Sequence, residues 1–482
     1  MSPYLVIFII AAYFLVLISI SYFTSRNANN ESFFLGNRKS PWYIVAFGMI
    51  SASLSGVTFI SVPGWVVDSN FSYMQMVIGY LLGYAIIANV LMPMYYRLNL
   101  TSIYTYLGQR FGKYSYKTGS SFFLLSRIIG ASFRLFLVAN VLQISVFNAL
   151  NIPFWITVVI TILLIWLYTF KGGIKTIIWT DSLQTIFMLA AVGVTIVLIS
   201  KQMNLDFKGV VDTVVNNEHS KLFYFDDFKS ANYFVKQFFA GAFIAVVMTG
   251  LDQDMMQKNL SCRNIREAKK NMYWMSISLV PVNLLFMSLG VLLVVFAQQN
   301  GILIPERTDD LFPLIATQGY LSPVVSIFFI IGLVAAAYSS ADSALTALTT
   351  SFTVDILNPQ NKTEAELKAI RKKVHVGVSA VLVIVILIFN AINNESVISA
   401  IFRVAGYTYG PLLGMYAFGM FTKYKTKDKY VPFVAIASPI ICYFLNIYSK
   451  EFLGGYQFGF ELVILNGLIT FLGLLLIRNN NK

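Results

Sequence analysis

The stretch Gly332–Ser351, GLVAAAYSSADSALTALTTS, has the apolar frame of a buried helix but carries polar side chains at its centre. Ser339, Ser340 and Ser343 follow one another at i, i+1 and i+4, so they share one face of a helix. Asp342 lies about 60° around that helix from Ser339. A carboxylate and three hydroxyls offer only oxygen ligands, which hard cations prefer. The stretch therefore predicts a cation site within a helix. The alternative is that its small residues only allow neighbouring helices to pack closely.

Composition places this helix in a membrane. The 482 residues are 57% hydrophobic and 12% charged, whereas soluble domains carry about 25% charged residues. Apolar runs of roughly 20 residues indicate membrane-spanning helices rather than a barrel. Two cysteines and two histidines give neither a disulfide framework nor a metal-ligand cluster. No nucleotide-binding motif of the G-x-x-x-x-G-K-[ST] or G-x-G-x-x-G type occurs, which argues against an ATP-driven pump.

Hydrophobic runs predict thirteen membrane-spanning helices in a single transmembrane domain, residues 1–482. Their expected ranges are 3–23, 42–66, 73–96, 119–149, 153–170, 176–200, 233–251, 272–298, 321–353, 373–392, 396–422, 430–448 and 457–477. The first range is not expected to be a cleavable signal, because it lacks a basic start and a small-residue cleavage site. The loop 201–232 is the longest, and 299–320 is expected to form a partly helical lid on the outer side.

Positive charge is distributed unequally between the two sides of this bundle. The loops after the odd-numbered spans hold most of the Lys and Arg residues, with clusters around 26–39, 97–117, 171–175, 258–270, 362–373, 423–429 and 478–482. The opposite loops hold only Lys201, Lys208, Lys221, Lys229, Arg307 and Lys450. By the positive-inside rule, the N-terminus is predicted outside and the C-terminus in the cytoplasm of a multi-pass protein of the inner or plasma membrane. The net charge of +13 then reflects topology and does not indicate a nucleic-acid partner.

The second span, 42–66, contains a run of small and hydroxyl residues, Ser51-Ala-Ser-Leu-Ser-Gly-Val-Thr58, followed by Pro63-Gly64. Such residues hold a helix poorly, so we expect the helix to break in mid-membrane. A break at this depth is tolerated where it lines a cavity, and there its carbonyls can coordinate a cation while the half-helix ends face a substrate. A kinked helix that serves only packing is the alternative.

Charged side chains in the fourth and sixth spans point to the same interior. Arg127 and Arg134 are seven residues apart and so share a helix face. The planar guanidinium suits a carboxylate, so at least one arginine is expected to meet an anionic substrate. The alternative is a structural pair with a carbonyl or with Asp252. Asp181 and Gln184 lie three residues apart near a helix start, where an N-cap role alone would explain Asp181.

Four segments resemble, in matching order, the motifs of the sodium:solute symporter family, and they are similar to sialic acid and organic anion members. They are Tyr168–Gln184, with its glycine pair, Gly250–Lys258, Ala336–Ser343 and Gly410–Gly414. The resemblance covers nearly the whole chain and implies an all-α polytopic fold of the LeuT type. Such a fold has a five-plus-five inverted repeat with a broken first core helix, which corresponds here to 42–66 and has its counterpart in 233–251. The implied repeats are 42–200 and 233–422, with an extra N-terminal helix at 3–23 and extra C-terminal helices at 430–477.

The resemblance also implies site residues. A general sodium site would use the carbonyls of Ser51, Leu54 and Ala336 and the hydroxyls of Ser339 and Ser340. Members with a second sodium ion imply a further site at Asp181, Ser339, Asp342 and Ser343. Because many members have a hydroxyl residue where this chain has Asp342, the count stays open at one or two sodium ions, and a proton at Asp342 is an alternative. Substrate contacts in a sialic-acid-transporting member match Ser53, Ser55, Thr58, Gln75 and Arg127, and Arg134 is the second arginine candidate.

Together these features predict a sodium-coupled secondary symporter that imports a small organic solute by alternating access, without enzymatic chemistry. The segment Ala245–Thr249 lacks the asparagine and paired aromatics of sugar-transporting members, which argues against a glucose-like sugar. The two arginines favour an anion, a carboxylate or an acidic sugar such as sialic acid. Alternatives are a transporter-like solute sensor, a symporter for a neutral sugar or amino acid, a facilitative channel, and a membrane-embedded enzyme that uses Asp181 and Asp342. The expected partners are the solute, sodium ions and the lipid bilayer, with no nucleic acid and no protein partner.

Overall fold

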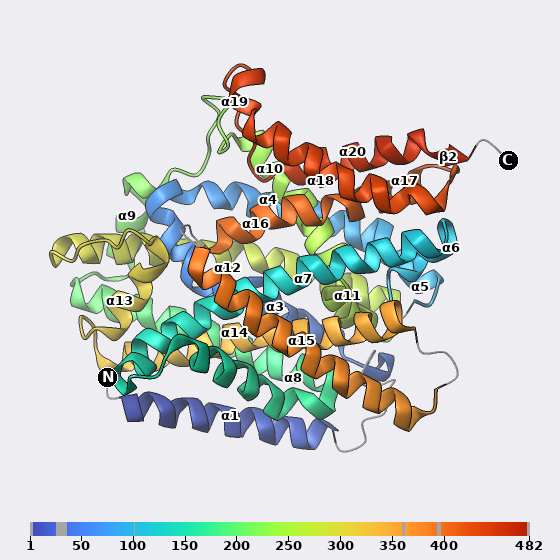
Figure 1. Ribbon diagram of the computed structural model, residues 1–482. Helices are drawn as coiled ribbons and strands as arrows, with labels where there is room; N and C mark the ends of the chain where they lie inside the picture. The colour runs from blue at the N-terminus through green and yellow to red at the C-terminus, as the bar shows by residue number, and fades with distance from the viewer. Residues whose placement is uncertain (1–2, 26–35, 101, 359–361, 393–396, 480–482) are drawn as a thin grey trace.

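The computed structural model describes residues 3–25, 36–100, 102–358, 362–392 and 397–479, which form a bundle of helices lying side by side (Figure 1). The α-helices are α1 (Pro3–Ser25), α3 (Trp42–Ser69), α4 (Tyr73–Ile86), α5 (Met92–Arg97), α6 (Thr105–Arg110), α7 (Lys113–Leu142), α8 (Phe154–Gln202), α9 (Phe207–Val215), α10 (Phe234–Ala245), α11 (Gln253–Leu260), α12 (Ile265–Gln299), α13 (Leu311–Thr317), α14 (Pro323–Ser351), α15 (Glu364–Ile392), α16 (Val397–Thr408), α17 (Gly410–Phe421), α18 (Val431–Ile447), α19 (Ser449–Phe452) and α20 (Leu462–Leu476).

Shorter turns connect or extend these helices. Six are 3₁₀ turns: η1 (Gly36–Arg38), η2 (Asn70–Ser72), η5 (Asn148–Leu150), η6 (Glu218–Ser220), η8 (Thr308–Asp310) and η10 (Asp428–Tyr430). Four are π-helical: η3 (Ile87–Leu91), η4 (Gln143–Phe147), η7 (Val246–Gly250) and η9 (Phe352–Leu357). Two antiparallel strands of two residues, β1 (Lys425–Thr426) and β2 (Arg478–Asn479), join the loop after α17 to the end of α20.

The all-helical prediction is confirmed. In the described residues, eight helices are long and apolar enough to span a membrane, and a ninth span results if one bent pair is counted as one. Four shorter apolar helices accompany them: Phe154–Trp166, Val397–Thr408, Gly410–Phe421 and Leu462–Leu476. One continuous apolar segment, Trp42–Arg97, contains the second and third expected spans, and α8 contains the fifth and sixth. The total of thirteen spans stays a prediction.

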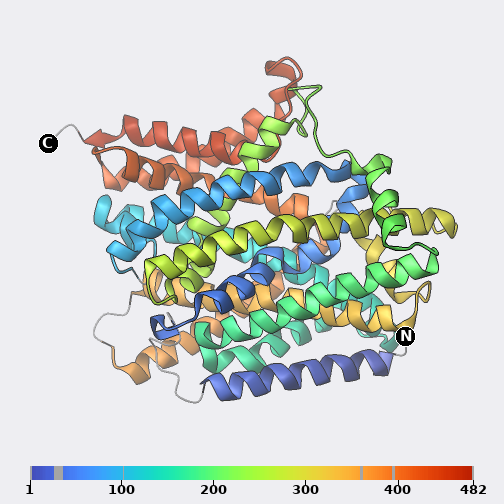
Figure 2. The same cartoon turned by 180° about the vertical axis from the view of Figure 1, so that it is seen from behind.

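The helix that contains the polar stretch, α14, lies at the centre of the bundle. Of its most apolar window, 78% is buried inside the protein, compared with 28% for α1 and 22% for α18. Figures 1 and 2 show α1 along one edge of the bundle and α18 and α20 along the opposite edge, with α14 between them. The serines and the aspartate of α14 are therefore shielded from lipid by neighbouring helices.

Helix α3 is broken at Ser55, as the run of small residues predicts. Ser55 has φ 45° and ψ 170°, whereas the residues on both sides are helical. For a residue with a side chain this conformation costs on the order of 1–3 kcal/mol, so surrounding packing must hold it. The next residue, Gly56, packs directly on α14, because a Cβ at Gly56 would lie 3.3 Å from the Cα of Ala337. The break is thus fixed against the polar stretch of α14.

A second break lies between α10 and α11. The helix α10 with its π-helical extension η7 meets α11 at an angle of 67°. Asp252 is the N-cap of α11, and its side chain accepts hydrogen bonds from the backbone N–H groups of Asp254 at 3.0 Å and Met255 at 3.3 Å. The sequence places the end of this span at residue 251 and assigns the residues after it to a charged loop. That assignment is wrong, because α11 is a buried helix throughout.

The connecting segments are partly helical. The loop 201–232 contains α9 and η6, and the segment 299–320 contains η8 and α13, as expected for a partly helical lid. This lid packs on the second half of α3, because a Cβ at Gly64 would lie 2.5 Å from the carbonyl oxygen of Thr308. The segment 299–320 therefore packs on the part of α3 that follows the break, and its role as an outer lid stays a prediction.

Candidate functional site

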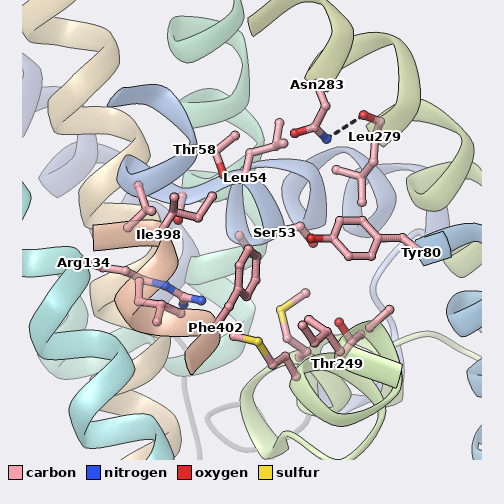
Figure 3. Close-up of a pocket in the computed structure, with 18 of the residues that line it drawn as sticks. Ser53, Leu54, Thr58, Tyr80, Arg134, Thr249, Leu279, Asn283, Ile398 and Phe402 are labelled. Atoms are coloured by element: carbon pink, nitrogen blue, oxygen red, sulfur yellow. Dashed lines mark hydrogen bonds between the residues drawn. The ribbon is translucent and has the colours of Figure 1, made fainter. Parts of the chain in front are cut away.

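A cavity of about 90 Å³ lies beside the break in α3 (Figure 3). Its walls come from α3, α4, α7, α10 with η7, α11, α12 and α16. Polar side chains make up about half of the lining: Ser53, Ser55, Thr58, Tyr73, Tyr80, Tyr84, Arg127, Arg134, Thr249 and Asn283. A cavity needs roughly 10–15 Å³ of such space for one water molecule, so this one has room for several waters or a small polar solute.

Three predicted substrate residues of α3 line this cavity: Ser53, Ser55 and Thr58. Asn283 on α12 lies across from them, and its Nδ2 donates to the carbonyl oxygen of Leu279 at 2.7 Å (Figure 3). The Oδ1 of Asn283 is buried and has no hydrogen-bond partner among the described residues. A buried acceptor without a partner is costly, so it marks a place where a ligand or a water molecule can donate a hydrogen bond.

Arg127 is held by two carboxylates of the protein. It is 5% exposed, and its guanidinium contacts Asp254 directly and lies 3.6 Å from the Oδ2 of Asp252. The same Oδ2 accepts a hydrogen bond from the Tyr409 hydroxyl at 2.7 Å. The structural alternative for Arg127, a pair with Asp252, therefore matches the geometry, and the pair fixes α7 to the start of α11.

Arg134 lies two helical turns further along α7. Figure 3 shows its guanidinium pointing inward toward Phe402, and both residues line the cavity. No ion pair or hydrogen bond joins Arg134 to any residue that the structure describes, and its Nε is buried without a partner. A half-buried guanidinium that makes no hydrogen bond or ion pair with the described residues can bind a carboxylate.

Residues of the predicted sodium site meet where α3, α8 and α14 cross. Ser51 Oγ and Ser339 Oγ lie 2.9 Å apart. The Ser339 hydroxyl donates to Asp181 Oδ1 at 2.7 Å, and Ser51 Oγ lies 3.1 Å from the carbonyl oxygen of Asp181. Gly48 allows this approach, because a Cβ there would lie 3.1 Å from the Cβ of Asp181. Three helices thus bring together oxygen atoms from residues 51, 181 and 339.

The remaining predicted ligands on α14 follow along the same helix. The Ser340 hydroxyl lies 3.4 Å from the carbonyl oxygen of Ala336, in donor geometry. Asp342 Oδ1 accepts from the backbone N–H of Ser343 at 2.5 Å. The Ser343 hydroxyl is buried without a hydrogen-bond partner among the described residues. All three polar side chains are fully enclosed by protein.

The carboxylate of Asp181 has a partner that the sequence does not predict. Lys258 on α11 donates to Asp181 Oδ2 at 2.8 Å, and both side chains are 1% exposed. The sequence assigns Lys258 to a positively charged cytoplasmic loop, whereas the second break carries it into the protein interior. Asp181 is therefore neutralised by the chain itself.

Residues 33–428 match the model of the sodium:solute symporter family. The chain belongs to this family. It is therefore a multi-pass membrane transporter that uses sodium, and not an enzyme.

Two relatives and one solved structure place the symporter within its family. The sodium/sialic acid symporter NanT of Aliivibrio fischeri is 27% identical over 425 residues, which are 83% of this chain and 80% of that protein. The human sodium/iodide cotransporter is 25% identical over 401 residues, 81% of this chain and 61% of that protein. A solved Na⁺-coupled sialic acid symporter, in a substrate-bound outward-open state, superposes with a TM-score of 0.82 at 21% identity, covering 98% of this chain and 97% of the other. This likeness shows the fold, the LeuT type expected from the motifs.

One predicted substrate residue of the symporter lies outside the cavity. Gln75 on α4 is buried, and its Nε2 donates to the carbonyl oxygens of Asn232 at 3.0 Å and Ser72 at 3.3 Å. Its Oε1 accepts from the backbone N–H of Tyr224 at 3.1 Å. The side-chain amide is thus fully used in fixing the loop before α10, and the structure does not bring it to the other substrate candidates.

Several lining residues of the symporter are absent from the sequence prediction. Tyr73, Tyr80, Thr249, Asn283 and Phe402 all line the cavity. A tyrosine or threonine in an apolar helix gives little signal, because the same residues serve as core or interface groups. Asn283 is the exception, since an amide in the middle of an apolar span is costly and indicates a polar interior.

Proposed function

We propose that this symporter imports a small organic anion, a carboxylate or an acidic sugar such as sialic acid, coupled to sodium by alternating access. The observation that carries the proposal is Arg134, a guanidinium in the cavity wall without an ion pair to any described residue. Arg127 supports it by contrast, because its charge is already balanced by Asp252 and Asp254. A guanidinium that no described carboxylate contacts suits the single carboxylate of a monoanion. The names of relatives such as the sialic acid symporter of Aliivibrio fischeri agree with this class of substrate.

Polar groups around Arg134 fit the rest of such a solute. The hydroxyls of Ser53, Ser55 and Thr58 lie on the α3 side of the cavity, with Thr249 and Asn283 on other walls. The second half of α3 begins at the break, so its first backbone N–H groups and the positive end of its dipole favour a negative charge. An acidic sugar would place its carboxylate at Arg134 and its hydroxyls among these side chains.

For sodium, we propose the general site formed by the carbonyls of Ser51, Leu54 and Ala336 and the hydroxyls of Ser339 and Ser340. The 2.9 Å distance between Ser51 Oγ and Ser339 Oγ supports this arrangement, as does the packing of Gly56 on Ala337. The Ser339 hydroxyl donates its hydrogen bond to Asp181, so the lone pairs of the Ser339 oxygen remain available to a cation. Asp342 and Ser343 are the remaining candidates for a second cation or, at Asp342, a proton.

Coupling follows from the break that both sites share. Leu54 is proposed to hold sodium through its carbonyl, and its neighbours Ser53 and Ser55 line the substrate cavity. Sodium and solute would each stabilise the same strained conformation at Ser55, so each raises the affinity for the other by the same factor. One sodium ion and one monoanion carry no net charge together, so the sodium concentration gradient supplies the free energy. A tenfold sodium gradient, about 1.4 kcal/mol, supports up to about a tenfold solute gradient.

We also propose the inverted repeats 42–200 and 233–422, with 3–23 and 430–477 as extra helices. The support is that each proposed repeat begins with a broken helix, at Ser55 in α3 and between η7 and α11. The proposed orientation, with the N-terminus outside and the C-terminus cytoplasmic, rests on the charges of the loops.

Competition for uptake tests the substrate class. Purified protein in liposomes with an inward sodium gradient is expected to accumulate radiolabelled N-acetylneuraminic acid or to be inhibited by another small carboxylate. N-acetylmannosamine, a neutral amino sugar without the carboxylate, serves as the matched control and is expected to compete poorly. Competition by neutral sugars or amino acids, with none by carboxylates, would show the neutral-solute alternative to be correct.

A further inference from the structure

The buried ion pair between Lys258 and Asp181 is not explained by the proposed substrate cavity or by the general sodium site. The ammonium lies 2.8 Å from Asp181 Oδ2, inside the bundle and out of contact with solvent. Lys258 comes from α11, the helix after the second break, whereas Asp181 comes from α8. An ion pair at this depth is costly to desolvate and does not by itself argue for stability. Its position beside the proposed sodium ligands suggests a function instead.

Both oxygens of Asp181 are engaged. Oδ2 accepts from Lys258, and Oδ1 accepts from the Ser339 hydroxyl at 2.7 Å. Ser339 in turn lies 2.9 Å from Ser51. A continuous chain of contacts therefore runs from the ammonium through the carboxylate to two residues of the general sodium site. It links α11, α8, α14 and α3.

We propose that the ammonium of Lys258 takes the place beside Asp181 that a second sodium ion would otherwise occupy. This inference rests on the proposed function and assigns its stoichiometry: one sodium ion per solute, bound at the general site. A sodium ion that used Asp181 Oδ2 would lie within a few ångströms of the ammonium, and two cations repel strongly in a medium of low dielectric constant. The tethered cation is present at full occupancy, so it prevents sodium from binding there.

The same contacts give Lys258 a positioning role. With Asp181 held as a carboxylate, the Ser339 hydroxyl donates its hydrogen toward Asp181, and its oxygen lone pairs point away from that bond. Asp254 and Asp342 are further carboxylates whose charge acts on the ammonium. Without Lys258, the carboxylate of Asp181 would be free to join Asp342 and Ser343 around a cation.

The test is the number of sodium ions bound by purified protein, measured with ²²Na⁺ by equilibrium dialysis. The wild type is expected to bind one ion, and Lys258→Met two, with the Hill coefficient for sodium in uptake rising from near one toward two. Lys258→Arg keeps the charge and is expected to bind one ion like the wild type. A second matched variant, Lys258→Met combined with Asp181→Asn, removes both charges and is expected to return to one ion.

The outcomes separate the two proposals. Two ions on the wild type would overturn the assignment of Lys258 without any mutation, so the inference stays testable even if Lys258→Met does not fold. A folded Lys258→Met protein that binds one ion would overturn it too. A wild type that binds no sodium would contradict the proposed function itself. A merely structural role predicts lower stability in Lys258→Met with an unchanged sodium count.

Discussion

Replacing Arg134 tests the anion site most sharply, because this guanidinium has no partner among the described residues. Hydrogen bonds to charged groups are worth about 1.5–3 kcal/mol. At a factor of ten per 1.4 kcal/mol, we expect Arg134→Gln to raise the KM for an anionic solute by about 10–100-fold. Arg134→Lys keeps the charge but loses the planar fork, so an intermediate effect is expected. Uptake in liposomes measures KM. The free energy of unfolding should change by no more than about 1 kcal/mol, since no hydrogen bond or ion pair to a described residue is lost.

Arg127→Gln is the matched control on the same face of α7. It removes the partner of two buried carboxylates, Asp252 and Asp254, and breaking a buried pair typically costs about 3–5 kcal/mol. Its main effect should be lower thermal stability and expression. The reasoning is refuted if Arg134→Gln transports with the wild-type KM. It is equally refuted if Arg127→Gln unfolds like the wild type but no longer binds the anion.

Three further changes probe the break, the sodium site and the lid. Gly56→Leu places a side chain against Ala337 and should abolish uptake without preventing membrane insertion. The control Gly193→Leu lies at a position with no neighbour within 4 Å and should transport normally. Equal activity of the two variants would contradict the close packing of Gly56 on α14. Ser340→Ala removes one of five proposed ligands and should raise the sodium concentration for half-maximal uptake by about 2–10-fold, so an unchanged sodium curve removes Ser340 from the site. In the lid, burial raises the pKa of Asp309 from its ordinary value to about 6, although its Oδ2 accepts the N–H of Val397 at 3.0 Å. Because the folded protein holds this proton more tightly than the unfolded chain, the free energy of unfolding falls by up to about 3 kcal/mol as pH rises from about 4 to 6. Asp309→Asn should lack this decrease. If the melting temperatures of the variant and the wild type change with pH in parallel, Asp309 is not its cause.

Local sequence predicts the broken helix because its cause is local. The run from Ser51 to Ser55, in which three of five residues are serines, together with Gly56 weakens the helix, and the break occurs at Ser55. Sequence does not show that Ser55, rather than Gly56, adopts the positive φ. That choice depends on how closely Gly56 must approach Ala337 on α14, which is a contact between distant parts of the chain.

Long-range pairs explain what the sequence analysis misses. Lys258 and Asp181 are 77 residues apart in the sequence. A hydropathy scale gives every lysine the same unfavourable value for burial, whether or not a carboxylate lies beside it in the fold. The same applies to Arg127, whose partners Asp252 and Asp254 come after the second break. The one usable signal is the charged run Asp252–Lys258 directly after an apolar span, within a segment that resembles a family motif. Charges so close to a span either end it or pair inside it, and spacing alone does not decide between the two.

Sodium-driven accumulation tests the central claim most directly. Purified protein is placed in liposomes, the membrane potential is clamped with potassium and valinomycin, and initial uptake of N-acetylneuraminic acid is followed with an inward gradient of sodium or of choline. We expect concentrative uptake with sodium and no accumulation with choline. An inside-negative potential should not increase the accumulation, because one sodium ion and one monoanion together carry no net charge. Equal uptake in sodium and choline, with the solute only reaching equilibrium, would contradict coupling and identify a facilitative pathway instead.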